Sequence, residues 1–475
     1  MLEQNSQPLL AALSQGTIAR EPAFGPAPKP VLGYFAEQLK FGRDPIGYLT
    51  GLHRDYGGVS AWGGNKPVLV FNFMPSTNEL ICNADQFDWA QKPLGRSPSA
   101  ALDVLSSGLL RKNGEEYKVG RQFLRTAFNQ KLMEAWRESM VLLTRDMLDH
   151  WKDGQQIDLL QQIRRLVVSI SISAVFGVKD PDVARTLDQL ISKLHTTGAR
   201  PTTFLFPFNL PGSSYRRMLE VSDQLVTFMK TLIQQARGTD CMLGMVADAK
   251  DENGVGLSET ELIGEAFQLM NLDNPVGALT WALFLLVQHP QVHADVLDEL
   301  ESVLHGDEPT FDQLGNLPLL ERVIKESLRL MPPFAFARRY ARSACELGPF
   351  HLPAGCRIIF SPYVTHRMPE IYSEPKRFLP ARWEKIRPSQ YEYFPFGAGS
   401  HFCLGMRFAT LEMKIVLASI IQRYRLAVLP KAQIDRVVRI VLLPKWGLPV
   451  HINRQDRKFR RSPIRGNIHQ MITFS

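Results

Sequence analysis

Cysteine is scarce in this sequence, and no two cysteines are spaced as a pair. The 475 residues contain five, at Cys82, Cys241, Cys345, Cys356 and Cys403. An odd number at irregular spacings, without any CxxC motif, is not the pattern of a disulfide framework or of a zinc cluster. Neither kind of cross-link is therefore expected to organise the fold.

The sequence also lacks the signals of export and of membrane insertion. Its N-terminus has no charged segment followed by an apolar one, and no window reaches the roughly 18 apolar residues that a spanning helix needs. We therefore expect a soluble, cytoplasmic protein without a membrane span.

Charge of one sign is not concentrated anywhere except near the C-terminus. The 55 basic and 47 acidic residues leave a formal net charge of +8, which is modest for this length. Basic residues are scattered and no nucleic-acid reading motif occurs, so no nucleic-acid partner is expected, whereas an acidic redox protein would suit the charge. The basic run after Arg454 is interpreted as a solvated, frayed tail.

No internal repeat and no low-complexity linker divides the chain, although its length would allow two or three domains. Hydrophobic residues make up 45% of the sequence, which is enough for a large core. Residues 21–33 contain four prolines and two glycines, a composition typical of an extended segment. Ordered structure should therefore begin near Tyr34.

Helical spacing of apolar residues dominates the middle of the chain. The longest predicted helix runs from Glu259 to Gln288, on the order of 45 Å, with Ser258 and Glu261 as a capping box and Pro290 after its end. Helical spacing of apolar residues also occurs over 141–178 and 218–236. Further helices are predicted over 319–330 and 404–424, and strands over 68–74 and on both sides of a turn at 353–355. The fold class that follows is mainly α with small β-sheets.

The most informative segment is 394–405, FPFGAGSHFCLG, which places one cysteine at the junction of a loop and a helix. Gly397, Gly399 and Gly405 permit positive φ and let the backbone approach a flat ligand, with N–H groups aimed at the Cys403 sulfur. A helix N-terminus also lowers the pKa of a thiol, and both effects favour the thiolate, which binds iron. Read alone, Cys403 could equally be a buried, inert cysteine.

Five positions in this segment, Phe396, Gly399, His401, Cys403 and Gly405, match the pattern F-x-x-G-x-[RH]-x-C-x-G. The segment resembles the haem loop of the cytochrome P450 family, and so many fixed positions in ten residues make a specific signal. The resemblance implies that Cys403 is the axial thiolate ligand of haem b, iron protoporphyrin IX, and that the other four residues shape the haem-binding loop.

Two other segments match the family in the same order. Glu326 and Arg329 form E-x-x-R on the helix that precedes two prolines, where side chains at i and i+3 share a face. Residues 378–383, FLPARW, resemble the element F-x-P-x-R-[FW] that follows. The resemblance implies that Glu326, Arg329 and Arg382 form a buried ion network that braces the haem loop.

The resemblance extends from about residue 30 to Arg454 and implies a single domain with the cytochrome P450 fold. The expected divisions are an extended leader over 1–30, the cytochrome P450 domain over 31–454 and a basic C-terminal tail over 455–475.

By the same resemblance, the haem carboxylates are bound by side chains from separate parts of the chain. Tyr117 and Arg121 occupy the W-x-x-x-R positions of the family's C helix, with Tyr in place of Trp. Arg339 in the segment RRYA and His401 complete the set. Arg338 could exchange with Arg339, because adjacent arginines cannot be told apart from the pattern.

The sequence departs from the family in the middle of the long helix. Family members have [AG]-G-x-[DE]-T-T there, and the first Thr helps deliver protons to dioxygen; here Asp273 keeps the acid, Asn274 replaces that Thr and Pro275 replaces the second. An Asn side chain can still hold an ordered water, so Asp273 and Asn274 are expected to be the proton-delivery pair. Because Pro275 has no N–H, the helix should kink here.

The resemblance implies a haem-thiolate monooxygenase that hydroxylates or epoxidises a small, largely apolar molecule with O2, such as a terpenoid, a lipid or another secondary-metabolite intermediate. The regions that contact substrate in the family are mostly apolar here, namely 102–109, 194–210, 267, 272, 334–337 and 440–441.

No reductase module is fused to the chain, so electrons should come from a separate ferredoxin or flavodoxin with its reductase. Arg121, Arg125, Arg407 and Lys414 lie on helices that flank the proximal face in the family, and they could steer such an acidic partner. The chain is expected to be a monomer.

Two alternatives stay open at this point. Because Asn274 replaces the usual Thr, the chain could be an isomerase, a dehydratase or a peroxide-using enzyme on the same fold, and dependence on O2 and on an electron donor would separate these classes. A haem-bearing ligand-binding or scaffold protein would bind haem and apolar molecules but would form no product.

Overall fold

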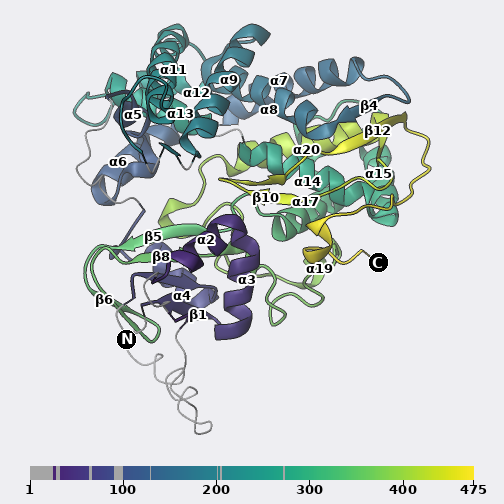
Figure 1. Ribbon diagram of the computed structural model, residues 1–475. Helices are drawn as coiled ribbons and strands as arrows, with labels where there is room; N and C mark the ends of the chain where they lie inside the picture. Colours follow the sequence, from purple (N-terminus) through teal and green to yellow (C-terminus); the bar gives the residue numbers. More distant parts are fainter. Residues whose placement is uncertain are drawn as a thin grey trace, which may run out of the picture.

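A computed structural model of the chain describes residues 25–27, 33–63, 67–89, 100–128, 130–200, 202–203, 206–270 and 273–474. Helices make up most of these residues, and small sheets lie beside them (Figure 1). The mainly α class with small β-sheets that the sequence predicts is therefore confirmed.

The helices are α2 (Phe35–Arg43), α3 (Pro45–Tyr56), α4 (Pro75–Asn83), α5 (Ala100–Leu105), α6 (Gly114–Arg125), α7 (Gln130–Asp149), α8 (Leu159–Phe176), α9 (Pro181–Gly198), α11 (Ser214–Ala236), α12 (Met242–Asp248), α13 (Glu259–Leu269), α14 (Asp273–Val287), α15 (Pro290–Leu304), α16 (Phe311–Gly315), α17 (Pro318–Leu330), α18 (Pro362–Thr365), α19 (Arg382–Lys385) and α20 (Met406–Arg423). Short 3₁₀ turns are η1 (Leu109–Arg111), η2 (Gly399–His401) and η3 (Asn467–Gln470). The strands are β1 (Val59–Trp62), β2 (Leu69–Asn72), β3 (Phe87–Asp88), β4 (Gln156–Asp158), β5 (Ala337–Ala341), β6 (Cys345–Leu347), β7 (Phe350–Leu352), β8 (Arg357–Phe360), β9 (Tyr424–Val428), β10 (Arg436–Val438), β11 (Leu442–Pro444) and β12 (Pro449–Arg454).

The largest sheet has the strand order β1-β2-β8-β5-β3 and lies close to α2, α3 and α4 (Figure 1). β2 pairs in parallel with β8, and β5 pairs antiparallel with β8, so that Arg339 lies opposite Ile358. Side chains alternate between the two faces of a strand. The register of β5 therefore turns Arg339 into the protein and leaves Arg338 exposed. Smaller sheets join β4, β12 and β9, β10 with β11, and β6 with β7.

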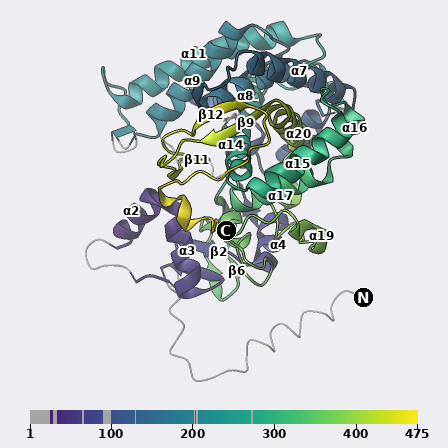
Figure 2. The same cartoon turned by 90° about the vertical axis from the view of Figure 1, so that its right-hand side faces the viewer.

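The helical part is built around α14, whose residues from Val276 to Val287 are all buried. A helix that is apolar on every face needs neighbours on every side, and α14 packs against α8, α17 and α20. The indole N–H of Trp281 donates a 3.0 Å hydrogen bond to the Leu442 carbonyl, which joins the helix to β11. Both views place α9 and α11 at the end of the molecule away from α3 and β1 or β2 (Figures 1 and 2).

The long helix predicted from Glu259 to Gln288 is two helices. The capping box of Ser258 and Glu261 is present, and the second helix ends at Val287, so both predicted ends are confirmed within a residue. α13 stops at Leu269, however, and α14 starts at Asp273, whereas residues 271 and 272 lie outside the described part. Met270, at the end of α13, has φ −84° and ψ 27°, so the helical path ends close to the position of the predicted kink. Pro275 falls in the first turn of α14, where a missing N–H costs no hydrogen bond.

The other predicted elements agree with the structure except in one place. The helical spacing over 141–178 belongs to two helices, α7 and α8, which are separated by a turn and by β4. Gly154 adopts φ +76° in that turn, and Gly154 N–H donates a 2.8 Å hydrogen bond to Ile452 of β12. Pairing with a distant strand therefore interrupts a segment whose apolar residues have helical spacing on both sides. The predicted turn at 353–355 separates β7 from β8.

The C-terminal tail is folded onto the protein, so the expectation of a solvated, frayed tail is wrong for residues 455–474. The chain continues from β12 past α15 (Figure 1), where Arg457 forms an ion pair with Glu301 at 2.6 Å. Farther along, Ile468, Met471 and Ile472 are buried in the main core. The basic residues that suggested a solvated tail alternate with apolar ones, and the apolar ones decide its placement. Most of the predicted leader over 1–30 lies outside the described residues.

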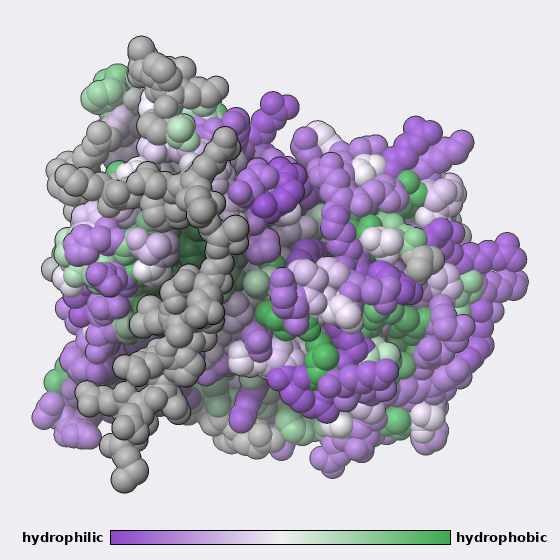
Figure 3. All heavy atoms as spheres, turned by 90° about the horizontal axis from the view of Figure 1, so that it is seen from below, coloured by the Kyte–Doolittle hydropathy of each residue, from purple (hydrophilic) through white to green (hydrophobic). Residues whose placement is uncertain are grey.

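Two helical segments are long and apolar enough to cross a membrane by length and composition, Leu159–Phe176 and Glu259–Val287. This criterion tolerates up to two charged residues, and Leu159–Phe176 contains Arg164 and Arg165, so it differs from the run of about 18 apolar residues that the sequence lacks. Inside the fold, 61% and 81% of the two windows are buried, as is usual for helices of a protein core. The face seen from below is mostly hydrophilic, with hydrophobic residues in small groups (Figure 3).

The packing of the tail leads to a prediction about stability. Replacing Met471, which is fully buried, by Ala should lower the free energy of unfolding by about 2–5 kcal/mol, because it removes apolar contacts and leaves a cavity. The exposed neighbour Gln470 offers a matched control, and Gln470→Ala should have little effect. Urea unfolding would measure both, and equal midpoints for the two variants would contradict the packing described for the tail.

Candidate active site

The loop around Cys403 joins η2 to the start of α20. Cys403 N–H donates a 3.0 Å hydrogen bond to the Phe396 carbonyl, which closes the loop. Gly399 has φ +67°, and a Cβ there would lie 2.6 Å from the Cys82 carbonyl oxygen, so only glycine fits. Gly397 also has positive φ, as predicted, whereas Gly405 does not. Two of the three glycines are therefore required by backbone conformation.

The environment of the Cys403 sulfur differs in one respect from the prediction. Burial raises the pKa of the Cys403 thiol above its usual value, although backbone N–H groups of Gly405 and Met406 and the charge of Arg121 act in the opposite direction. The expected lowering by the helix N-terminus is therefore outweighed by desolvation in the protein alone. The N–H groups that the sequence placed around the sulfur are present, and they favour the thiolate once a cation is bound to it.

Arg339 is a buried cation that has no counter-ion in the described part of the chain. Its side chain is 1% exposed, and its guanidinium donates a 3.1 Å hydrogen bond to the carbonyl of Arg338 and lies 3.2 Å from the Trp89 ring centroid. Among the described residues, no carboxylate forms an ion pair with it. Burial lowers the pKa of Arg339 to about 9. Of the two arginines that the sequence left open, Arg339 is the one that is buried in the protein.

His401 lies close to this cation. Its imidazole stacks on the Tyr117 ring at 3.7 Å, and Trp89 lies 4.7 Å away on centroid distances. The buried Nδ1 has no hydrogen-bond partner among the described residues. Burial, helped by the charges of Arg339 and Arg121, lowers the pKa of His401 to about 3, so the ring is neutral.

Tyr117 and Arg121 form the second half of the cluster. The Arg121 guanidinium donates to the Tyr117 hydroxyl at 2.8 Å and to the Phe402 carbonyl at 2.7 Å, and the hydroxyl donates to the Ser400 carbonyl at 3.2 Å. α6 is thereby attached to the loop that carries Cys403. The four side chains predicted to bind the haem carboxylates thus lie together.

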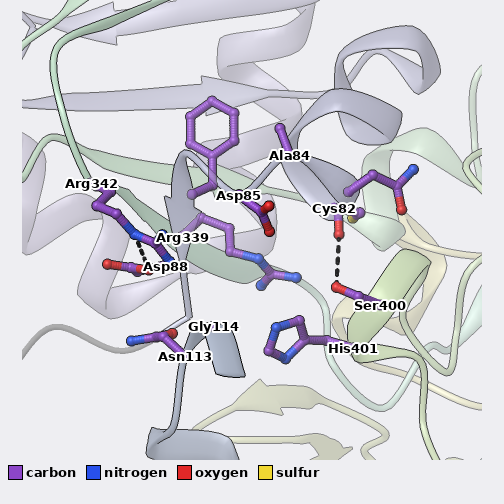
Figure 4. A pocket seen from close by; sticks show the side chains of 12 residues that line it. Cys82, Ala84, Asp85, Asp88, Asn113, Gly114, Arg339, Arg342, Ser400 and His401 are labelled. Carbon is purple, nitrogen blue, oxygen red and sulfur yellow. Dashed lines mark hydrogen bonds and ion pairs between the residues drawn. The ribbon is translucent and has the colours of Figure 1, made fainter. Parts of the chain in front are cut away.

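A small, partly open pocket borders the cluster, and Arg339, Ser400 and His401 are among the residues that line it. Figure 4 shows the guanidinium of Arg339 extending into it above the His401 ring, with Ser400 beside them. A buried cation without a carboxylate and an imidazole nitrogen without a partner are both costly unless a ligand satisfies them. Haem carries two carboxylates and an iron that binds thiolate. The residues therefore fit this group.

The second predicted cluster is a buried ion network around Glu326. One oxygen accepts from Arg329 at 2.8 Å and from Arg382 at 2.9 Å, and the other accepts from Arg329 and from the Trp383 indole at 2.9 and 3.0 Å. Leu379 N–H adds a further 3.0 Å bond. Burial alone would raise the pKa of Glu326, but the two arginines and Leu379 N–H lower it overall.

This network connects to the segment that leads into the Cys403 loop. Trp383 packs edge-to-face on Tyr393 at 4.6 Å between ring centroids, and the next residue, Phe394, donates its N–H to His366 at 3.0 Å. The carbonyl of His366 in turn accepts a 2.9 Å hydrogen bond from Arg329. Two short routes therefore hold the start of the loop, one by packing and one by hydrogen bonds.

The predicted acid and amide lie at the start of α14. Asp273 accepts a 2.6 Å hydrogen bond from Arg164 of α8. The buried Oδ1 of Asn274 has no hydrogen-bond partner among the described residues. An amide oxygen in this condition is suited to accept a bond from a water or a ligand.

Three residues at these sites were missed from the sequence. Trp89 covers Arg339 and His401, whereas Arg164 and His195 approach Asp273 from α8 and α9. They lie between about 80 and 310 positions from the residues that they contact, and only the fold brings them together. No spacing in the sequence marks them.

The four basic residues expected to attract an acidic redox partner differ in how exposed their side chains are. Arg125 and Arg407 are exposed. Lys414 is instead paired with Glu321 at 3.2 Å and donates to the Leu314 carbonyl, with 11% of its side chain exposed. Arg121, as described above, is turned toward the Cys403 loop. The expectation that all four are available to a partner is wrong for Lys414 and Arg121, because internal acceptors satisfy them.

Comparison with known proteins agrees with this geometry. The family profile described as Cytochrome P450 matches residues 22–447. The chain belongs to the cytochrome P450 family. A solved structure of the retinoic acid bound cyanobacterial CYP120A1 superimposes with a TM-score of 0.76 at 24% identity, covering 88% of this chain and 96% of that one. The likeness confirms the cytochrome P450 fold.

Curated relatives are bacterial cytochromes P450 with named oxygenase activities. A cyclooctat-9-en-7-ol 5-monooxygenase of Streptomyces melanosporofaciens is 28% identical over 447 residues, 89% of this chain and 94% of the relative. A pentalenene oxygenase of Streptomyces avermitilis is 26% identical over 438 residues, 87% of this chain and 93% of the relative. The chain is an oxidoreductase of the monooxygenase family.

The uncompensated charge of Arg339 yields a prediction with a neighbouring control. Arg339→Leu should speed haem loss by about 10- to 100-fold, since a charge-assisted hydrogen bond contributes about 1.5–3 kcal/mol. The same variant should make the haem-free protein no less stable, because it removes a buried unpaired cation. Arg338→Leu changes an exposed side chain and should leave haem loss unchanged. Transfer of haem to apomyoglobin measures the rates, and equal rates for both variants would contradict the assignment.

Proposed function

We propose that the chain is a haem-thiolate monooxygenase that oxidises a largely apolar terpenoid with O2. The observation that carries the proposal is the joint placement of a thiol, Cys403, with Arg339 and His401. Among the described residues, Arg339 has no carboxylate partner, and Nδ1 of His401 has no hydrogen-bond partner. A family member that kept the fold but not the cofactor would have no need for this buried, unbalanced charge.

The residues that would hold haem can be named from these contacts. Cys403 would bind the iron through its sulfur, and Phe396, Gly399 and Gly405 keep the loop in place or leave space beside it. Arg339, His401, Tyr117 and Arg121 would bind the two carboxylates. The network of Glu326, Arg329 and Arg382 positions the loop from behind. When bound, haem supplies the iron chemistry that activates O2.

Asp273 and Asn274 would serve the distal side. Asp273 can hold a proton at a carboxylate oxygen, and the Asn274 amide can both accept and donate a hydrogen bond. Among the described residues, Oδ1 of Asn274 at the start of α14 has no hydrogen-bond partner, so it could accept a bond from water. The pair would deliver protons in place of the acid and hydroxyl that are usual in the family.

The terpenoid class is supported by two independent features. The relatives named above act on cyclooctat-9-en-7-ol and on pentalenene. Segments corresponding to substrate contacts are largely apolar in this chain, and Phe206 and Phe208 are 62% and 61% exposed rather than packed in the core. Exposed aromatic side chains on this loop are suited to the entry of an apolar molecule.

Electrons would come from a separate ferredoxin or flavodoxin with its reductase, and the exposed Arg125 and Arg407 could meet an acidic partner of this kind. A cytoplasmic location and a monomeric state complete the proposal. The burial of both apolar helices within the fold supports the first of these.

Isotopically heavy O2 tests the proposal. Purified protein, with a plant-type ferredoxin and its reductase, should insert one heavy oxygen atom into a cyclic sesquiterpene or diterpene from a panel that includes pentalenene.

Asn274→Ala should release more peroxide per electron consumed, by several-fold, because the amide no longer holds water near the site. Asn274→Thr restores a hydroxyl and should keep peroxide release near that of the wild type.

Two results would contradict this proposal. Product that forms without O2 or without an electron donor would identify an isomerase, a dehydratase or a peroxide-using enzyme. Unchanged peroxide release in Asn274→Ala would remove the amide from the proton path.

A further inference from the structure

Asp273 is part of a polar cluster that links three helices. Arg164 of α8 donates from Nη1 to Oδ1 of Asp273 at 2.6 Å. The same guanidinium donates to Asp188 and Ser192 of α9, at 3.0 and 2.9 Å. Arg164 thus holds the carboxylate of Asp273 at the start of α14 and links it to α9.

The second oxygen of this carboxylate faces a histidine. Nδ1 of His195, one turn beyond Ser192 on α9, lies 3.9 Å from Oδ2 of Asp273. Arg164 occupies Oδ1 only, and among the described residues no hydrogen-bond donor reaches Oδ2. The separation is roughly 1 Å longer than an N–H···O hydrogen bond, so a small side-chain rotation would close it.

His195 also has access to solvent. Its side chain is 31% exposed, in contrast to 19% for Asp273. The ring lies 6.5 Å from the Phe267 ring of α13, which covers one of its sides. Of the two groups, His195 is therefore the more accessible to solvent, and it lies beside the acid at the start of α14.

The charges around His195 suit a group that takes up and releases protons. Burial lowers the pKa of His195 below its usual value, while the charge of Asp273 raises it and the charge of Arg164 lowers it further. Asp188, on the same helix, is already bound to Arg164. The imidazole is consequently neutral at neutral pH, with one nitrogen that donates and one that accepts.

We propose that His195 is a proton relay between solvent and Asp273. Nε2 takes a proton from water, Nδ1 gives up its proton to Oδ2 of Asp273, and the ring returns to its first tautomer by rotation or exchange with solvent. Asp273 then passes the proton to a water held by Asn274. No charge accumulates, because each proton that enters at His195 leaves toward Asn274. This inference rests on the proposed role of Asp273 in proton delivery.

The relay predicts that the two residues titrate as a pair. In haem-loaded protein, reduced and bound to CO so that it is diamagnetic, nitrogen-labelled histidine reports the pKa of each imidazole by NMR, and His195→Gln identifies the signal. Asp273→Asn should lower the pKa of His195 by about one unit, since a nearby negative charge is lost. An unchanged pKa would show that the two groups do not interact and would overturn the proposal.

Electron consumption from a plant-type ferredoxin in the presence of O2 supplies the second readout. His195→Gln should slow electron consumption by about 10-fold and increase its solvent deuterium isotope effect. Loss of the acid itself can slow the reaction more, by roughly 100-fold or more. In His195→Ala, added imidazole should restore the rate. The exposed His150, which directly follows the end of α7, is the matched control, and His150→Gln should behave as wild type.

The outcomes separate this inference from the proposed function. A slow Asp273→Asn variant beside a normal His195→Gln variant would overturn the relay and leave the acid in place. Normal rates in both variants would overturn the relay together with the proposed role of Asp273. A slow His195→Ala variant that imidazole does not restore would mean that the histidine is structural, which also overturns the relay.

Discussion

The structure depends first on the buried carboxylate of Glu326. Removing one partner from a buried ion pair costs about 3–5 kcal/mol, because the remaining charge is left without compensation. Here a single carboxylate accepts hydrogen bonds from Arg329, Arg382, Trp383 and Leu379 N–H. These bonds join α17, the loop before α19 and α19 itself. Since Trp383 packs on the residue just before the Cys403 loop, the position of the thiol relies on this charge balance.

The opposite condition holds a short distance away, where positive charge is not balanced by the protein. Arg339 is as deeply buried as Arg329 but has no carboxylate among the described residues, and His401 remains neutral beside it. A protein that keeps such a cation gives up stability in the absence of its ligand. Binding of a dianionic cofactor would recover that stability, so the same residues that weaken the free protein select the group that it binds.

Local sequence patterns predicted the elements and motifs well, but not the contacts made between distant segments. The Cys403 loop and the E-x-x-R helix were identified because each requires fixed residue types at short spacing. The sequence could not choose between Arg338 and Arg339, because that choice depends on the register of β5 against β8. It also missed His195, which approaches Asp273 only through the packing of α9. The tail was misjudged for a similar reason, since its buried residues are few and widely spaced among charged ones.

The central claim is that Cys403 is the thiolate ligand of a haem, and the absorption spectrum of the reduced, CO-bound protein tests it most directly. The account predicts a strongly red-shifted Soret band in the wild type, because thiolate ligation pushes electron density onto the iron. Cys403→Ser should lose that band, whereas Cys345→Ser, which changes a partly buried cysteine at the start of β6, is a control in which the band should persist. Absence of bound haem, or a band that is the same in Cys403→Ser as in the wild type, would contradict the account.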